Sequence, residues 1–315
     1  MIKYIFTIIK SNNINVLTFK WLIIIGIICL LFLLLQKFGD KPENLEGFSQ
    51  IEPFVFKQND DVYDDFYSLI YDDIHKPSLR TDYELEYIIN MTEPTTRNSV
   101  FLDIGSGTGN TVNELQEAGY QAYGIDKSQA MIDIAEQKFP DIQCKCGDAT
   151  EPMAFEHSTF THIICNYFTI YQIKEKRTLF TNCNHWLMPN GYLIIHLADR
   201  NKFDTITPVG KMTLPVNPNR YISSRITDTI VDFGGFEYKS SYQFHKENDN
   251  IVSFVEKFQD KETKHVRENE QILYFEPIDV ILNMARECGF SLKSKIDMKK
   301  NIDDENQYIF ILEKI

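Results

Sequence analysis

The segment from residue 100 to residue 109 constrains the fold of this chain more than any other, because an apolar run leads directly into closely spaced glycines. Val100–Leu102 is typical of a buried parallel strand, which ends at Asp103. Three glycines then stand at alternate positions, namely Gly105, Gly107 and Gly109. A helical segment over Thr111–Glu117 follows. Such glycines allow a tight turn and close approach of the backbone to a ligand at a helix N-terminus, so the segment predicts a ligand-binding turn in an α/β fold.

The positions of the glycines discriminate between the ligands that such a turn can bind. The dinucleotide fingerprint has glycines at its first, third and sixth positions, whereas here they are first, third and fifth, and Asn110 is sixth. The carboxylate of Asp103 would repel the pyrophosphate of a dinucleotide but would stabilise a ligand that carries an ammonium and a sulfonium group. The turn therefore favours a sulfonium cofactor, and a nicotinamide-dependent oxidoreductase is the disfavoured alternative.

Two more acidic residues follow predicted strands in the same way. A strand over Gln121–Ile125 ends at Asp126, where a carboxylate can accept hydrogen bonds from two ribose hydroxyls. A short strand over Ile142–Cys146 precedes Asp148, which can accept a hydrogen bond from the amino group of adenine. Acidic residues at three successive strand ends thus predict one site for an adenosine-containing ligand.

The motifs Asp103-Ile-Gly-Ser-Gly-Thr-Gly109, Gly124-Ile-Asp126-Lys-Ser128 and Gly147-Asp148-Ala149 resemble the cofactor motifs of the class I S-adenosylmethionine-dependent methyltransferases. The resemblance covers about residues 63–315. It implies an α/β fold with a doubly wound, Rossmann-like sheet of seven strands that ends in an antiparallel hairpin. It also implies S-adenosyl-L-methionine as the cofactor and methyl transfer as the activity. A catalytically inactive partner or regulatory subunit that binds S-adenosylmethionine is the alternative.

The resemblance also assigns the cofactor-binding residues. They are Tyr71, Asp103, Gly105, Ser106, Gly107, Gly109, Asp126, Lys127, Asp148, Ala149 and Asn166. Tyr71 belongs to a stripe of tyrosines at helical spacing, a pattern that more often reflects packing. In related methyltransferases a similar N-terminal helix covers the cofactor, which makes Tyr71 a candidate contact for the methionine carboxylate.

The remainder of the chain alternates strands and helices, as a doubly wound sheet requires. Further strands are predicted at Thr161–Asn166, Tyr192–Leu197, Ser291–Met298 and Tyr308–Glu313. Helices are predicted at Glu175–Leu187 and at Ile278–Cys288, the second of which stops at Gly289.

An insertion at about residues 205–275 is additional to the strands and helices of the doubly wound sheet. It contains four strand-like runs separated by polar turns, namely Ile222–Phe233, Phe236–His245, Ile251–Gln259 and Val266–Phe275. Alternating polar and apolar residues predict an antiparallel meander. Because ligands bind beyond the carboxyl ends of the strands in doubly wound folds, we expect this meander to be a substrate lid. A sheet that only stabilises the fold or mediates dimerisation is the alternative.

Methyl transfer from a sulfonium requires little beyond holding the acceptor about 3 Å from the methyl group. A base is needed only if the acceptor must lose a proton. His196, at the end of the predicted fifth strand, is the candidate base because its reference pKa is near 6.5. Tyr171 follows the fourth strand, where class I enzymes place groups around the methyl, and is the second candidate catalytic residue. Packing of His196 within the core is the alternative.

The N-terminal part of the chain differs in character. Trp21–Gln36 is an uncharged run of 16 residues between Lys20 and Lys37. As a helix it would span about 24 Å, somewhat less than a hydrocarbon core of ~30 Å, and both lysines can reach the headgroups. We expect a tail (1–20), a transmembrane helix (21–37), a linker (38–60) and a methyltransferase domain (61–315). A signal peptide would have an unusually long n-region and lacks a cleavage site, and a buried core helix would have a polar face.

Two arguments about the orientation of this anchor disagree. The tail carries lysines and no acidic residue, so the positive-inside rule would export the domain. S-adenosylmethionine is a cytosolic metabolite, however, and the six cysteines show no disulfide framework. We give the cofactor more weight and expect a single-pass membrane protein whose catalytic domain lies in the cytosol.

Charge and cysteine spacing restrict the partners. The formal net charge is −13, with 45 acidic and 32 basic residues, and no basic stripe interleaves with aromatic residues. This balance argues against a nucleic acid as acceptor. Cys144 and Cys146 share a strand face, but no second Cys or His pair follows at ligand spacing, so we expect no metal. The expected partners are the lipid bilayer and an acceptor that is a small molecule, a lipid or a membrane-associated protein.

Overall fold

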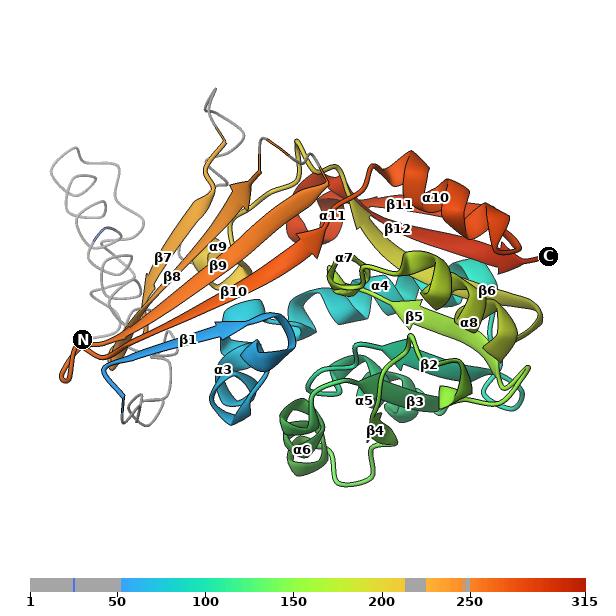
Figure 1. Ribbon diagram of the computed structural model, residues 1–315. Helices are drawn as coiled ribbons and strands as arrows, with labels where there is room; N and C mark the ends of the chain where they lie inside the picture. Colours follow the sequence, from blue (N-terminus) through green and yellow to red (C-terminus); the bar gives the residue numbers. More distant parts are fainter. Residues whose placement is uncertain (1–24, 26–51, 213–224, 246, 248–249) are drawn as a thin grey trace, which may run out of the picture.

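A computed structural model describes residues 25, 52–212, 225–245, 247 and 250–315. The described residues form an α/β layer around a seven-stranded sheet and a second, five-stranded sheet beside it (Figure 1). The seven-stranded sheet has the order β11-β12-β6-β5-β2-β3-β4. Its strands are β2 (Val100–Ile104), β3 (Gln121–Asp126), β4 (Cys144–Cys146), β5 (Phe160–Cys165), β6 (Leu187–Ala198), β11 (Phe290–Met298) and β12 (Asp304–Lys314).

The direction of the strands confirms the expected doubly wound sheet. β4, β3, β2, β5 and β6 are parallel, whereas β12 is antiparallel to β6 and pairs with β11 in the last hairpin. β2 has β3 on one side and β5 on the other, so the strand order reverses at β2. Ligands bind in the crevice at such a reversal, beyond the carboxyl ends of the strands.

Helices cover both faces of this sheet because its central strands are buried on both sides. Adjacent residues of one strand belong to different apolar clusters: Phe101 packs with residues 85, 88, 112 and 115 on one face, and Leu102 with residues 179, 183, 281 and 285 on the other. Continuous apolar runs are typical of parallel strands in this position. The helices are α3 (Asp65–His75), α4 (Ser78–Thr92), α5 (Asn110–Glu117), α6 (Gln129–Lys138), α7 (Thr169–Gln172), α8 (Lys176–Trp186), α9 (Pro208–Met212), α10 (Ile278–Glu287) and α11 (Lys299–Ile302), with short 3-10 turns at Asn59–Val62 and Pro152–Ala154.

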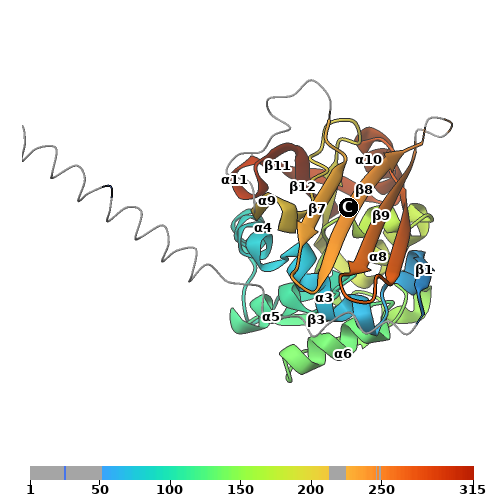
Figure 2. The same ribbon diagram turned by 90° about the vertical axis from the view of Figure 1, so that its left-hand side faces the viewer.

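The second sheet contains the predicted meander. Its order is β1-β10-β9-β8-β7, and the pairs from β7 to β10 are antiparallel. The strands are β1 (Phe54–Gln58), β7 (Asp228–Asp232), β8 (Phe236–Phe244), β9 (Ile251–Asp260) and β10 (Val266–Tyr274). Tyr238 and Phe258 of this sheet pack against Tyr67 of α3, so the sheet lies across the helix that precedes the α/β layer (Figures 1 and 2).

The start of the folded part differs from the expected linker boundary. Residues 54–58 form β1, which pairs in parallel with β10, from Phe54 opposite Val266 to Gln58 opposite Glu270. The linker over 38–60 therefore has to be shortened at its C-terminal end. The edge of β10 offers unpaired N–H and C=O groups, and a segment distant in sequence satisfies them.

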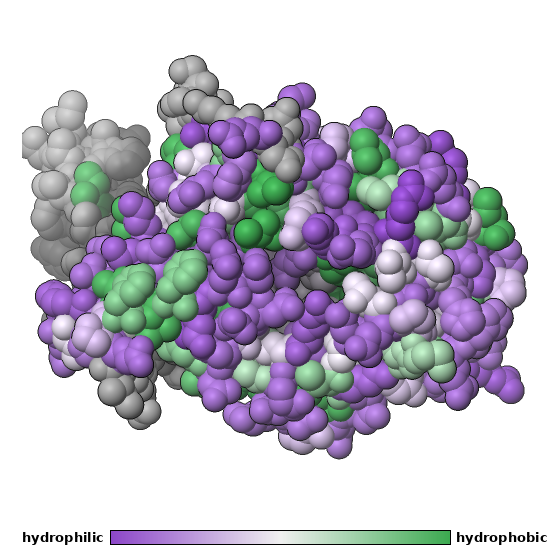
Figure 3. All heavy atoms as spheres, in the orientation of Figure 1, coloured by the Kyte–Doolittle hydropathy of each residue, from purple (hydrophilic) through white to green (hydrophobic). Residues whose placement is uncertain are grey.

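The expected tail, the transmembrane helix at 21–37 and the linker up to residue 51 lie outside the described residues, apart from residue 25. Within the part of the chain that the structure describes, every helix is too short or too polar to cross a bilayer. The face of the described domain seen in Figure 3 is mostly hydrophilic, and its hydrophobic side chains gather in small groups.

Candidate active site

The turn after β2 is held in a conformation that glycine adopts readily. Gly105, Gly107 and Gly109 have φ angles of 70°, 52° and 82°, all in the left-handed region. The N–H groups of Gly105 and Ser106 donate to the carbonyl of Ile125 at 2.8 and 3.2 Å, which fastens the turn to β3. We refer to residues 105–109 as the glycine loop.

The three glycines have different surroundings. A Cβ atom on Gly105 would lie 2.5 Å from Thr169 Cγ2, and one on Gly109 would lie 2.4 Å from Ile142 Cδ1. A Cβ on Gly107 would meet nothing closer than Tyr71 Cε1 at 3.9 Å. Packing therefore explains the outer two glycines, whereas the middle one borders open space.

That space is a cleft between the glycine loop and α3. Two adjoining cavities share five lining residues, which are Tyr71, Gly105, Gly107, Tyr167 and Thr169. We call them together the loop cleft. Burial raises the pKa of the Tyr71 hydroxyl well above its usual value, so this group is a neutral hydrogen-bond donor. Asp103, Ser106 and Asn166 also line the loop cleft, as expected from the sequence.

Asp126 connects the glycine loop to the end of β3. Its Oδ2 accepts the N–H of Gly107 at 2.9 Å, and its Oδ1 accepts the N–H of Ser128 at 2.9 Å. Burial raises the pKa of Asp126, and these two hydrogen bonds oppose that shift. The carboxylate thus fixes the position of Gly107, the residue that borders the open cleft.

Lys127 and Asp148 lie together farther along the same edge of the sheet. Lys127 Nζ is 3.1 Å from Asp148 Oδ2 and 3.5 Å from Asp60 Oδ2. The other oxygen of Asp148 accepts the N–H and the hydroxyl of Thr150, both at 2.7 Å. Ala149, in contrast, is buried in the core (6% exposed), and its carbonyl accepts the side-chain N–H of Asn182. The structure therefore places Lys127 and Asp148 at the carboxyl edge of the sheet, whereas the side chain of Ala149 lies in the core.

The electrostatics of Asp103 favour a cationic ligand. Burial, with Glu84 and Asp126 acting in the same direction, raises the pKa of Asp103 to about 8. The carboxyl group is therefore largely protonated at neutral pH in the free protein. A positive charge bound nearby would favour its ionised form, and binding of a cation and ionisation of Asp103 would reinforce each other.

Comparison with known proteins agrees with this geometry. Residues 101–191 match the family described as "Methyltransferase domain". Similar folds include an S-adenosylmethionine-dependent methyltransferase from Clostridium acetobutylicum (TM-score 0.59, 18% identity, 79% of this chain and 98% of that one). Another is an amino pentose methyltransferase from Micromonospora echinaspora with S-adenosylmethionine bound (TM-score 0.52, 15% identity, 75% and 90%). The chain has a class I S-adenosylmethionine-dependent methyltransferase fold. Residues 101–191 are identified by the family match as a methyltransferase domain.

Curated relatives cover a smaller part of the chain. An uncharacterized methyltransferase from Alkaliphilus oremlandii is 33% identical over 101 residues, which are 31% of this chain and 45% of that protein. Carboxy-S-adenosyl-L-methionine synthase 1 from Yersinia pseudotuberculosis is 28% identical over 127 residues, or 39% and 44%. The chain thus matches less than half the length of these two relatives.

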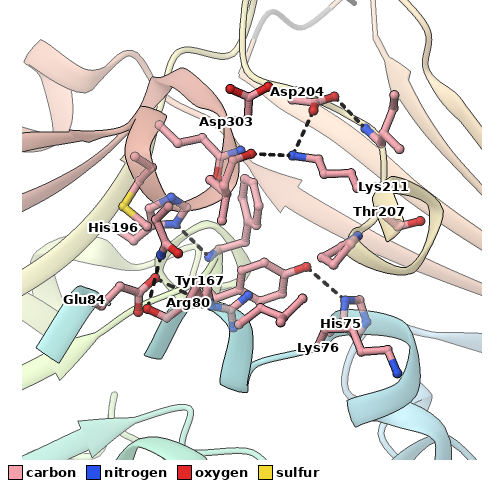
Figure 4. A pocket seen from close by; sticks show the side chains of 18 of the residues that line it. His75, Lys76, Arg80, Glu84, Tyr167, His196, Asp204, Thr207, Lys211 and Asp303 are labelled. Atoms are coloured by element: carbon pink, nitrogen blue, oxygen red, sulfur yellow. Dashed lines mark hydrogen bonds and ion pairs between the residues drawn. The ribbon is translucent and has the colours of Figure 1, made fainter. Parts of the chain in front are cut away.

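A larger cavity adjoins the loop cleft of the methyltransferase domain. Its volume is about 360 Å³, and it lies between α4, the end of β6, the segment 204–211 and α11 (Figure 4). Its apolar wall includes Leu79, Phe168, Ile206, Tyr242, Met298 and Ile302. Tyr167 lines both this cavity and the loop cleft, and we name the cavity the acceptor cavity for the role that we propose for it.

Tyr167 separates the two spaces and is fixed from several sides. Its hydroxyl lies 3.0 Å from His75 Nδ1, and the guanidinium carbon of Arg80 lies 3.4 Å from its ring centroid. Tyr167 and Phe168 both have left-handed backbones, with φ of 47° and 45°. Two consecutive non-glycine residues in this region store strain of about 1–3 kcal/mol each, and such strain concentrates at functional sites.

The inserted meander contributes to the same walls. Tyr242 of β8 lines both the acceptor cavity and the loop cleft, and Phe254 and Leu273 line the loop cleft. The inserted sheet therefore lies beyond the carboxyl ends of the parallel strands, beside the site, and its role as a substrate lid stays a prediction.

His196 lies where the sequence predicted, in the wall of the acceptor cavity, but its chemistry differs from the expectation. Its Nδ1 accepts the N–H of Phe168 at 3.4 Å, and its side chain is 2% exposed. Burial, with the positive charge of Arg80, lowers its pKa to about 3. His196 is therefore a neutral imidazole and not the expected base with a pKa near 6.5. One of its ring nitrogens already accepts a hydrogen bond.

Tyr171 differs from the expectation in its location. Its hydroxyl accepts the N–H of Ala198 at 2.8 Å and donates to the carbonyl of Ala198 at 3.3 Å. Its ring stacks on Phe275, with centroids 3.8 Å apart and planes 6° from parallel. The side chain is fully buried and joins α7 to β6, so this geometry gives it a packing role.

Sequence reasoning missed Glu84, which lines both the acceptor cavity and the loop cleft. The side chain of Asn166 donates to Glu84 Oε2 at 2.8 Å, and Arg80 Nε is 3.6 Å from Oε1. Burial raises the pKa of Glu84 to about 7. The spacing of Arg80 and Glu84 is that of an ordinary surface pair on a helix, so their position at the site has no signal in the sequence.

Proposed function

We propose that this chain is an active S-adenosylmethionine-dependent methyltransferase that transfers the methyl group to a small molecule bound in the acceptor cavity. The observation that carries the proposal is the meeting of the acceptor cavity and the loop cleft at Tyr167. A donor in the cleft and an acceptor in the cavity would face each other there. The volume of about 360 Å³ lies within the range of small-molecule sites, roughly 300–1,000 Å³.

The residues of the cleft fit the parts of the cofactor, which supplies an activated methyl group when bound. Asp126 would accept hydrogen bonds from the ribose, and Lys127 with Asp148 would border the adenine. At the other end, Tyr71 would donate to the methionine carboxylate, and Asp103 with Asn166 would face the ammonium group. Gly107 lacks the side chain that would fill this space.

We further propose that the apolar segment 21–37 anchors the enzyme at a membrane, with its catalytic domain in the cytosol. The chain between this segment and β1 comprises residues 38–53, which can extend over at most about 55 Å. An anchored domain would remain close to the bilayer and would encounter lipophilic acceptors at high local concentration. The apolar wall of the acceptor cavity suits such molecules.

The test uses the full chain in detergent and S-adenosylmethionine labelled on its methyl group. Calorimetry measures cofactor binding, and the labelled cofactor is then incubated with the small-molecule, lipid and protein fractions of a cell lysate. We expect binding, and label that appears in the small-molecule fraction. Label in lipid or protein instead refutes the small-molecule acceptor. Binding without transfer to any fraction identifies the inactive partner, and no binding refutes the proposal altogether.

A further inference from the structure

Glu84 occupies a distinctive place at the proposed site. Among the described residues, it is the acidic side chain that lines both the acceptor cavity and the loop cleft, so its carboxyl group lies near the point where donor and acceptor would meet. The side chain is 3% exposed, and Asn166 and Arg80 orient it. Figure 4 shows Glu84 and His196 on one side of Tyr167, at the base of the acceptor cavity.

The surroundings of Glu84 favour a ligand that donates several hydrogen bonds and carries positive charge. The Oδ1 atom of Asn166 is buried and has no hydrogen-bond partner among the described residues. Asn166 lines the loop cleft, so this oxygen would face the donor, whereas the Glu84 carboxylate borders the acceptor cavity as well. The rings of Phe168 and Tyr242 line the acceptor cavity, and aromatic faces attract cations; the ring of Tyr167 already has the guanidinium of Arg80 over it, at 3.4 Å.

We propose that the acceptor is an amine, which binds as its ammonium ion beside Glu84 and transfers a proton to the Glu84 carboxylate before methylation. This inference rests on the proposed methyltransferase function and names its substrate class.

The proton transfer is chemically feasible for an amine and not for an aliphatic alcohol. Glu84 has a pKa of about 7 because of its burial. A lysine-type ammonium has a reference pKa of about 10.4, and desolvation in the cavity lowers it, whereas the hydroxyl of water has about 15.7. The charged and titratable groups that interact with Glu84 are Arg80 on its own helix, Asp103 on β2 and Tyr167 after β5, and the neutral His196 of β6 lines the same cavity. Arg80 opposes the rise in pKa of Glu84, and His196 is too weak a base to compete for the proton.

The ammonium loses one N–H proton to the carboxylate of Glu84, which leaves a neutral amine and a carboxylic acid. The nitrogen lone pair then forms a bond to the methyl carbon while the carbon–sulfur bond breaks, and its electron pair stays on sulfur. The products are an N-methylammonium and the neutral thioether S-adenosylhomocysteine. Glu84 finally releases its proton to water, so one proton leaves per methyl group.

The experiment compares matched amines and alcohols as acceptors for the full-length protein. The panel contains cyclohexylamine with cyclohexanol, benzylamine with benzyl alcohol, glucosamine with glucose, and p-cresol as a phenol. We expect N-methylated products from amines and none from their hydroxyl counterparts. At pH 7.5, Glu84→Gln should lower kcat by about 10²–10⁴-fold. Glu86→Gln, the same change on the exposed side of α4, is the control and should leave kcat unchanged.

The pH profile separates a proton acceptor from a residue that only shapes the site. In the wild type, kcat/KM for the amine should rise through about pH 7 as Glu84 of the free enzyme ionises. Glu84→Gln should lose this limb, and Glu84→Asp should restore it. Cofactor binding and thermal unfolding of each variant report whether it is folded. If Glu84→Gln does not fold, the pH profile of Glu84→Asp tests the inference instead.

Three outcomes would overturn the inference: methylation of an alcohol or of p-cresol, wild-type kcat in folded Glu84→Gln, or no amine methylated by protein that binds S-adenosylmethionine. Failure of the wild-type protein to bind S-adenosylmethionine would instead refute the proposed function.

Discussion

The glycine loop permits a direct test of the proposed cofactor site, because its glycines differ in how much room the structure leaves for a side chain. In Gly107→Ala the new methyl group lies in open space, so the stability cost is that of a left-handed alanine, roughly 1–2 kcal/mol. In Gly109→Ala the methyl group also lies 2.4 Å from Ile142 Cδ1 and 3.0 Å from Ala135 Cβ. Such overpacking adds about 1–3 kcal/mol, for a total of about 2–5 kcal/mol.

For cofactor binding we expect the larger loss in Gly107→Ala and the smaller loss in Gly109→Ala, the reverse of their effects on stability. The alanine side chain at position 107 would project into the loop cleft, so we expect the Kd for S-adenosylmethionine to rise at least tenfold, or about 1.4 kcal/mol. Folded Gly109→Ala should lose less affinity, because its side chain points toward α6.

Denaturant unfolding without cofactor and calorimetry with cofactor measure the two quantities. Gly119→Ala serves as the control for backbone strain alone, since its φ is 88° and its Cβ would be 3.5 Å from Thr96. The reasoning fails if Gly107→Ala binds with wild-type affinity, or if Gly109→Ala is no less stable than Gly119→Ala.

Three further predictions concern other parts of the molecule. Asp126→Ala removes the acceptor of the Gly107 N–H and of the expected ribose hydroxyls, and calorimetry should show a loss of about 1.5–3 kcal/mol in cofactor binding; wild-type affinity would contradict the assignment. Burial raises the pKa of Glu256 in the second sheet to about 7 from its usual 4.5. As the pH rises from 4.5 to 7, Glu256 therefore ionises in the unfolded state but stays protonated in the folded state, and the free energy of unfolding falls. Relative to Glu256→Gln, unfolding experiments should show the wild type losing on the order of 3 kcal/mol across that interval, and parallel curves would refute this. Deleting residues 1–40, which leaves β1 intact, should move the protein from the membrane fraction to the supernatant with unchanged cofactor affinity; a truncated protein that still pellets with membranes would place the anchor elsewhere.

Local signals in the sequence predicted most of the α/β layer correctly. The apolar runs of β2, β5 and the second half of β6 lie in strands that are buried on both faces, whereas β3 alternates between exposed and buried residues over its first four positions. The helix boundaries of α8 and α10 also agree with the sequence to within one or two residues. The glycine loop was recognisable because a left-handed backbone at alternate positions requires a specific residue type.

Features that depend on long-range pairing were not predictable in the same way. β1 is five residues long and joins the second sheet only through β10, more than 200 residues away. Tyr171 follows β5 as expected, but the stacking on Phe275 decides that its hydroxyl binds to Ala198. Neither contact leaves a periodic pattern in the sequence.

By itself, then, the sequence determined the doubly wound class of the sheet, the glycine loop and the acidic residues at the ends of its strands, because short motifs carry these properties. The tertiary structure alone decided the chemistry of the acceptor side. His196 becomes a weak base and Glu84 a carboxyl group that titrates near neutral pH, because burial disfavours the charged form of each. Burial depends on how α4, β6 and the inserted sheet pack together, and that packing depends on contacts between residues far apart in the chain.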